Sequence, residues 1–149
     1  MTNNLTAHSH QLYQPLSPEK LLFERNKKTR HLKIHGYKEN VDHNNPLYFY
    51  GSDENEIVKI SNEDGMSELL SASLGIMKAQ VVWAVRHEMA RTVEDVLARR
   101  VRCQLLDAKE SIKMAPKVAS AMAVELGENK AWEEKQVADY VQVTMNYIL

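Results

Sequence analysis

The stretch from residue 81 to residue 108 restricts the fold of this chain more than any other. Apolar side chains recur in it at spacings of three and four residues, and arginines and acids fill the positions between them. Such a pattern is typical of amphipathic helices that pack on other helices. It predicts a helix over 76–90, with Ala79, Val82, Trp83 and Ala90 on one buried face, and a second helix over 92–106. The second helix is expected to bury Val93, Val96, Leu97, Val101 and Leu105.

Near residue 66 the chain changes character. Three of its four prolines and many of its Asn and His residues lie before this point, whereas helix-favouring Ala, Glu, Val, Met and Leu dominate after it. The first part is therefore predicted to be irregular. We expect a mobile segment over 1–15, a short helix over 18–26, a strand or core-plugging coil over 47–50, and a helix over 53–65 capped by Ser52.

The second part is predicted to be a run of helices separated by capping residues. A short helix is expected over 66–71, ahead of the two helices above, and a capping box at Thr92 begins the second of those. Asp107 should cap a helix to residue 114, Pro116 should open the next, Gly127 should end it, and Asn129 should cap the last. The predicted fold class is mainly α: a compact multi-helix orthogonal bundle with an irregular N-terminal part and little or no sheet, in a single domain over 1–149.

Length, charge and cysteine content exclude several classes of protein. The chain has 149 residues and a formal net charge of −1, which disfavours a protein that chiefly grips nucleic acid or an anionic membrane. The apolar run over 81–85 is too short to cross a bilayer. The lone Cys103 cannot form an internal disulfide and is interpreted as a buried packing residue, and the first residues lack the pattern of a secretory signal. These features predict a cytoplasmic location.

The sequence contains no convincing motif for binding a metal ion or a dinucleotide. His31 and His35 are four residues apart and could share a metal on a helix, but Leu32 and Ile34 alternate with polar residues and Gly36 follows, which predicts an extended segment. The five glycines are scattered, so no glycine-rich loop for a dinucleotide pyrophosphate can be built. No metal, cofactor or catalytic residue is therefore predicted in this chain.

Five arginines form a basic cluster: Arg86, Arg91, Arg99, Arg100 and Arg102. Guanidinium groups bind phosphates and carboxylates, so the cluster is a candidate for anion binding or for contact with another domain. Acids are interleaved with it, however, and helical spacing would pair Glu88 with Arg91, and Asp95 with both Arg99 and Arg102. A structural network of salt bridges is the favoured interpretation, and anion binding or inter-domain contact is the alternative.

The same stretch carries a family resemblance. The runs that carry it are Val82-Trp83-Ala84-Val85-Arg86, Glu88-Met89-Ala90-Arg91-Thr92, Glu94-Asp95-Val96-Leu97-Ala98-Arg99-Arg100, Leu106-Asp107-Ala108, Ala115-Pro116-x-Val118-Ala119 and Glu125-Leu126-Gly127, with Leu32-Lys33-Ile34-His35-Gly36 and Tyr50-Gly51-Ser52-Asp53 upstream. On these runs the chain resembles the C-terminal domain of FAD-dependent glycerol-3-phosphate dehydrogenases and of the related glycerophosphate oxidases. The chain departs from the family pattern at Ser73 to Ile76 and at Gln80, where an acid is common.

The resemblance implies a parent enzyme that oxidises sn-glycerol 3-phosphate to dihydroxyacetone phosphate with bound FAD and passes electrons to quinone, or to oxygen in the oxidase branch. In that family the FAD-binding catalytic domain precedes the segment seen here, so no catalytic or flavin-binding residue is carried over. The chain is then expected to be an accessory domain, inactive alone, that packs on the catalytic domain and contributes contacts to a homo-oligomer. Any membrane contact, at the cytoplasmic face, is expected only through the parent.

Two other interpretations belong to different classes. One is a free-standing helical interaction module. The other is a nucleic-acid-binding module that uses residues 97–106 as a recognition helix, against which the near-zero net charge counts. An upstream dinucleotide-binding unit in the same reading frame would favour the flavoenzyme domain over both.

Overall fold

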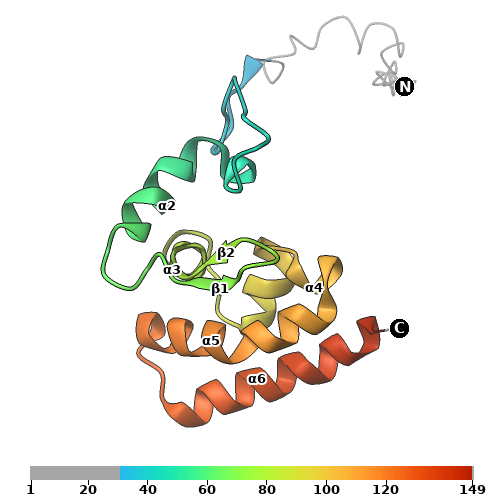
Figure 1. The fold of residues 1–149 in the computed structure, drawn as a ribbon. Helices are drawn as coiled ribbons and strands as arrows, with labels where there is room; N and C mark the ends of the chain where they lie inside the picture. The colour runs from blue at the N-terminus through green and yellow to red at the C-terminus, as the bar shows by residue number, and fades with distance from the viewer. Residues whose placement is uncertain (1–30, 149) are drawn as a thin grey trace, which may run out of the picture. The chain divides into compact units, whose positions relative to one another are not determined.

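The computed structural model describes residues 31–148, and it confirms a mainly α-helical fold with one small sheet (Figure 1). The described residues 35–148 belong to one compact unit, of which His31 to Ile34 are not part. The elements are η2 (Tyr48–Asp53), α2 (Glu54–Ser61), β1 (Leu69–Ser71), β2 (Ile76–Met77), α3 (Lys78–His87), η3 (Asp95–Arg100), α4 (Cys103–Leu106), α5 (Ala108–Leu126), α6 (Lys130–Thr144) and η4 (Met145–Tyr147). The predicted helix over 18–26 and the predicted mobile segment over 1–15 lie outside the described residues.

Helix α3 lies at the centre of the larger unit because two of its faces are buried. Val81, Ala84 and Val85 join a large apolar core formed with η3, α5 and α6. Val82 and Trp83 face the other way and join a smaller core, whose remaining members are Leu47, Tyr50, Ile57, Ile60 and Ala79. The smaller core therefore ties η2 and α2 to one side of α3.

Helices α5 and α6 form an antiparallel pair beneath α3 (Figure 1). Three capping predictions are confirmed here. The Asp107 carboxylate accepts a hydrogen bond from the Glu110 N–H at 2.9 Å, the Asn129 side chain accepts one from the Trp132 N–H at 3.1 Å, and Gly127 ends α5 in the left-handed region. Buried polar contacts also join the pair, since the Tyr140 hydroxyl donates to the Ser111 Oγ at 2.9 Å.

Pro116 lies inside α5, so the prediction that it opens a new helix is wrong. A proline within a helix leaves the carbonyl four residues earlier, here that of Ile112, without its partner. The helix nevertheless continues because the side chains on either side of the proline are fully buried in the large core. These are Met114, Ala115, Val118, Ala119 and Met122.

The prediction of a helix over residues 66–71 is wrong. β1 instead pairs with β2 in a short antiparallel hairpin. Leu69 lies opposite Met77, and Ser71 lies opposite Ile76. Leu69 is exposed, whereas Leu70 and Ser71 are both buried. The hairpin turn includes Gly75 at a φ of 65°, a conformation that glycine adopts without strain.

The expected helix over 76–90 is shorter than predicted. α3 ends at His87, and Met89 has a φ of 56°, so the chain turns before Ala90. Ala79, Val82, Trp83 and Ala90 are all buried as predicted, but Ala90 belongs to the large core rather than to the face of the other three. Ser52 does not cap α2, since its hydroxyl hydrogen-bonds to the Asp53 carboxylate instead.

Candidate functional site

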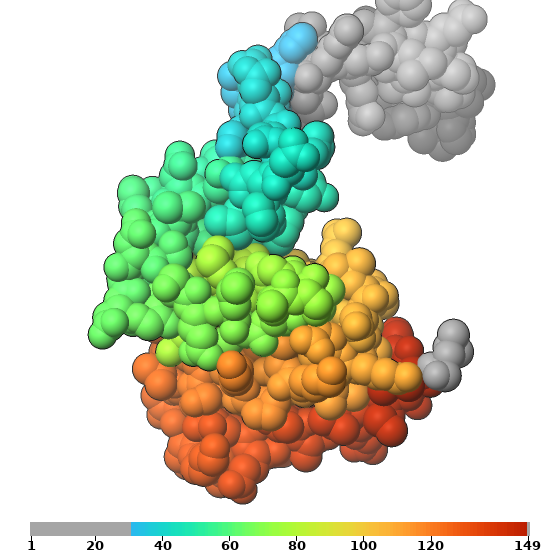
Figure 2. All heavy atoms as spheres, in the orientation of Figure 1, coloured from blue at the N-terminus to red at the C-terminus, as the bar shows by residue number. Residues whose placement is uncertain are grey.

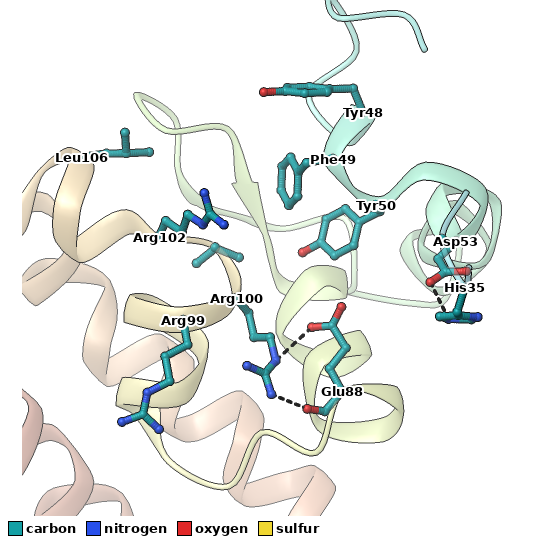
Figure 3. Close-up of a pocket in the computed structure, with 12 residues that line it drawn as sticks. His35, Tyr48, Phe49, Tyr50, Asp53, Glu88, Arg99, Arg100, Arg102 and Leu106 are labelled. Atoms are coloured by element: carbon teal, nitrogen blue, oxygen red, sulfur yellow. Dashed lines mark hydrogen bonds and ion pairs between the residues drawn. The ribbon is translucent and has the colours of Figure 1, made fainter. Parts of the chain in front are cut away.

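A groove with a volume of about 670 Å³ opens between η2 and the junction of η3 with α4 (Figure 3). Figure 2 shows it as a notch between the cyan surface before α2 and the gold surface around α4. The residues that line it are His35, Gly36, Tyr48, Phe49, Tyr50, Asp53, Glu88, Arg99, Arg100, Val101, Arg102 and Leu106. It brings together three of the five predicted arginines with an aromatic wall.

Three consecutive aromatic residues form the first wall. The rings of Tyr48 and Phe49 meet edge to face at 5.8 Å between centroids, and those of Phe49 and Tyr50 lie 4.4 Å apart. Tyr50 is buried in the smaller core, and burial raises the pKa of its hydroxyl, which accepts a hydrogen bond from the Gln80 amide at 3.5 Å. Tyr48 is 41% exposed and Phe49 is 48% exposed. The first wall thus presents apolar surface that nothing in the described chain covers.

The aromatic wall is held in place by two glycines. Gly51 has φ 59° and ψ −121°, and a Cβ atom built on it would lie 1.7 Å from the carbonyl oxygen of Gly36. The same oxygen accepts a hydrogen bond from the Ser52 N–H at 3.2 Å. His35 Nε2 lies 2.8 Å from the Asp53 carboxylate beside this contact. The two upstream runs that carry the family resemblance are therefore in direct contact.

The second wall begins at the capping box that the sequence predicts. The Asp95 N–H donates to Thr92 Oγ1 at 3.1 Å, and the Thr92 N–H donates to the Asp95 carboxylate at 3.0 Å. Burial alone would raise the pKa of Asp95, but hydrogen bonds from Arg91 and Thr92 and the charge of Arg99 lower it below its usual range. Arg99 pairs with Asp95 at 2.6 Å, as predicted, and also with Glu94 at 2.8 Å.

The expected helix over 92–106 is interrupted, which changes the position of Arg102. Residues Asp95–Arg100 form a π-helix, Arg102 has a φ of 56°, and α4 begins after it. The predicted pairing of Asp95 with Arg102 is therefore wrong, and Leu105, expected in the core, is exposed. Within residues 31–148 the Arg102 guanidinium has no hydrogen-bond or ion-pair partner, and Figure 3 shows it extending toward the aromatic wall.

Glu88 and Arg100 form the floor of the groove. Arg100 Nη2 donates to the Glu88 carbonyl at 2.5 Å, and its Nε lies 3.4 Å from Glu88 Oε2. Trp83 Nε1 donates to Glu88 Oε1 at 3.2 Å, whereas Oε2 is buried without a hydrogen bond from the described residues. Burial raises the pKa of Glu88. The predicted pairing of Glu88 with Arg91 is wrong because the turn at Met89 separates them.

The other two predicted arginines lie away from the groove. Arg86 binds Glu125 of α5 through two hydrogen bonds, from Nε at 2.7 Å and Nη2 at 2.9 Å, a geometry that joins α3 to α5. Arg91 donates to the backbone carbonyls of Val85 and Ala90, at 3.3 Å and 3.0 Å. Both act within the fold. The salt-bridge interpretation thus describes Arg86 and Arg99 well and leaves Arg102 outside it.

Sequence reasoning did not find the aromatic wall or the role of Glu88. Tyr48 and Phe49 were interpreted as part of a strand or core plug, although three consecutive aromatic residues cannot all face one core in a regular strand. That alternation is the signal that could have indicated exposed rings. His35, weighed as a metal ligand, pairs with Asp53, and no group of three His, Cys, Asp or Glu residues among 31–148 could hold a metal ion.

Comparison with known proteins identifies the family. The family model described as the C-terminal domain of alpha-glycerophosphate oxidase matches residues 22–137, most of the chain. The chain belongs to this family. Relatives include a probable mitochondrial glycerol-3-phosphate dehydrogenase of Dictyostelium discoideum, 28% identical over 66% of this chain, and mitochondrial glycerol-3-phosphate dehydrogenases of Arabidopsis thaliana, 26% over 59%, and Saccharomyces cerevisiae, 26% over 75%.

The match covers only part of each relative. The chain aligns with 15%, 14% and 16% of the lengths of the Dictyostelium, Arabidopsis and yeast proteins, and no solved structure matches. All three relatives are named as mitochondrial, which contradicts the predicted cytoplasmic location. That prediction relied on the lack of a secretory signal and on a lone cysteine, and neither feature distinguishes the cytoplasm from other reducing compartments. None of the described helices is long and apolar enough to cross a membrane.

Proposed function

We propose that this chain is the accessory C-terminal domain of an FAD-dependent glycerol-3-phosphate dehydrogenase. The parent would oxidise sn-glycerol 3-phosphate to dihydroxyacetone phosphate in a separate catalytic domain and pass the two electrons to quinone. The observation that carries the proposal is the family match over residues 22–137, together with relatives that are dehydrogenases several times longer than this chain. The domain's own role is to pack on the catalytic domain and to contribute to contacts in a homo-oligomer.

The residues of this chain do not fit a flavin dinucleotide. Such a site needs a glycine-rich turn that joins a strand to a helix, with the pyrophosphate at the helix N-terminus. Gly36, Gly65 and Gly127 lie in turns, and Gly51 lies within η2. Gly75 alone lies between the two short strands. The FAD is therefore assigned to the catalytic domain, and no chemical step is assigned to residues of this chain.

The structure disfavours the alternative in which residues 97–106 act as a recognition helix for nucleic acid. It requires one continuous recognition helix over 97–106, but the left-handed turn at Arg102 divides that segment. Arg99 and Arg100 are also paired with acids, which reduces the charge available to phosphates.

Two measurements test the proposal. The purified 149-residue chain should show no binding of FAD in calorimetry at the low-micromolar level, about −8 kcal/mol, and no dye reduction with glycerol 3-phosphate. The full-length protein that carries this domain should reduce the dye with glycerol 3-phosphate and bind FAD. Tight flavin binding by the short chain, or no activity in the full-length protein, would contradict the proposal. Adding quinone or oxygen to the active enzyme distinguishes the two electron acceptors.

A further inference from the structure

We propose that the groove between the aromatic wall and Arg102 is the docking site for an extended segment of the catalytic domain that carries a carboxylate. The inference rests on the proposed function, since it names the part of the parent that this domain recognises. Its two components are a cation without a partner among residues 31–148 and exposed apolar surface, both lining one groove.

One of the cations that line the groove has no partner among residues 31–148. Arg99 is paired with two acids, and Arg100 is paired with Glu88. His35 is paired with Asp53. Arg102 is exposed and has no partner among residues 31–148. Arg102 is therefore the groove-lining cation that can pair with a carboxylate from outside the described residues.

Arg102 is also an unusual residue for its backbone position. Its φ of 56° and ψ of 19° lie in the left-handed region, where glycine or asparagine is less strained than arginine. The guanidinium makes no hydrogen bond or ion pair within residues 31–148. A strained residue whose charged group has no partner in the described fold is more simply explained by a partner outside it.

The size and chemistry of the groove favour a protein segment over a small phosphate. A phosphate dianion is best held by two or more free cations, and here the other two arginines that line the groove, Arg99 and Arg100, already pair with acids. Glu88 also lines the groove, and its negative charge would repel a dianion. Tyr48, Phe49 and the 71%-exposed Leu106 would cover apolar side chains beside the carboxylate. A volume of about 670 Å³ accommodates several side chains.

Site-specific photo-cross-linking in the full-length enzyme tests this inference. The substitution Phe49→p-benzoylphenylalanine keeps an aromatic ring in the wall and places a photoreactive group in the groove. Peptide mapping should find cross-links to a catalytic-domain segment that contains Asp or Glu. The yield should fall roughly tenfold in an Arg102→Gly background, the change that corresponds to losing one charge-assisted hydrogen-bonded pair.

The variants are chosen so that failure to fold cannot explain the result. Arg102→Gly relieves the left-handed strain, so its fold should be at least as stable as that of the unsubstituted chain. Lys109→Gln removes one positive charge from an exposed position outside the groove and should leave the cross-link yield unchanged.

Several outcomes would overturn the inference. They are an absence of cross-links, cross-links only to a second copy of this domain, and a yield that is the same in Arg102→Gly. Suppression by inorganic phosphate, but not by chloride at equal ionic strength, would identify a small-anion site instead. Dye reduction by the same preparations judges the proposed function separately: an active enzyme without these cross-links overturns only the groove, and an inactive one with them overturns only the function.

Discussion

Replacing Gly51 by alanine should destabilise the contact that positions the aromatic wall. The added Cβ would lie 1.7 Å from the Gly36 carbonyl oxygen, and real Cβ contacts are essentially never shorter than 3.0 Å. The atom that obstructs it belongs to the backbone, so no side-chain rotation can relieve the overlap. The two segments must separate, which breaks the hydrogen bond from the Ser52 N–H to that oxygen.

The expected loss follows from three contributions. Holding a non-glycine residue in this sparsely populated region costs about 1–3 kcal/mol. Losing the Ser52 hydrogen bond costs about 1 kcal/mol more. Alanine restricts the unfolded chain and returns about 0.4–1 kcal/mol. The net destabilisation of the Gly36–Gly51 contact is therefore about 1–3.6 kcal/mol. The hydrogen bond is included in full because the overlap forces the two segments apart.

Gly65→Ala is the matched control. Gly65 has a φ of 71°, but a Cβ there would meet no atom within 4 Å. Left-handed strain of about 1–2 kcal/mol, less the same unfolded-state gain, predicts a net loss of about 0–1.6 kcal/mol in the free energy of unfolding. The comparison isolates the overlap with Gly36 from the conformational preference that both glycines share.

Urea unfolding followed by tryptophan fluorescence measures the global effect of each variant. Hydrogen exchange of the Ser52 amide measures local opening, which matters because the contact can separate without unfolding α3. We expect faster exchange at Ser52 in Gly51→Ala and unchanged exchange in Gly65→Ala. If both variants lose the same stability within about 0.5 kcal/mol and protect the Ser52 amide equally, the reasoning is refuted.

Three further predictions concern the core, a helix cap and the cysteine. Trp83 is 5% exposed, so Trp83→Ala should lower the free energy of unfolding by about 3–5 kcal/mol. In a Trp132→Phe variant that keeps Trp83, the fluorescence maximum should be blue-shifted. A solvent-like maximum would contradict the burial of Trp83. Thr92→Ala should lower the free energy of unfolding by about 1 kcal/mol, because it removes the hydroxyl that accepts the hydrogen bond from the Asp95 N–H. The folded-state pKa of Asp95 is lowered, so its stabilising effect should be present above its ordinary pKa of about 4 and disappear as the pH falls through the folded value. The stability difference between the unsubstituted chain and Asp95→Asn should shrink over that acidic window, and a constant difference would count against the box. Burial raises the pKa of the Cys103 thiol to about 12. A thiol reagent at neutral pH should therefore label Cys103 only as fast as the chain unfolds. Rapid labelling of the folded chain would contradict the burial of this thiol.

The helical fold class and most helix caps could be predicted because they depend on residues close together in the chain. The carboxylate of Asp107 caps a backbone N–H three residues later, and Asn129 and the Thr92 box act over the same distance. Burial of Trp83 and its neighbours followed from helical spacing, and the family followed from runs of side chains that a short sequence window displays.

The candidate site could be predicted only in part. The arginine cluster was visible, and the pairing of Asp95 with Arg99 is a four-residue contact. The partner of Arg86 is Glu125, 39 residues away, and no local pattern indicates such a pair. The aromatic wall was missed for the same reason, because its position depends on the contact between Gly36 and Gly51.

By itself, then, the sequence determined the caps at Asp107, Gly127 and Asn129, which faces are apolar and which family the chain belongs to, since these follow from interactions within a turn or two of helix. Only the tertiary structure decided where those helices break. The buried amide of Gln104 donates to Thr144 of α6 at 2.9 Å, and Cys103 is buried in the large core. Anchoring α4 in this way turns the chain at Arg102 and directs its guanidinium away from Asp95 into the groove, because long-range packing outweighs the local preference for one continuous helix.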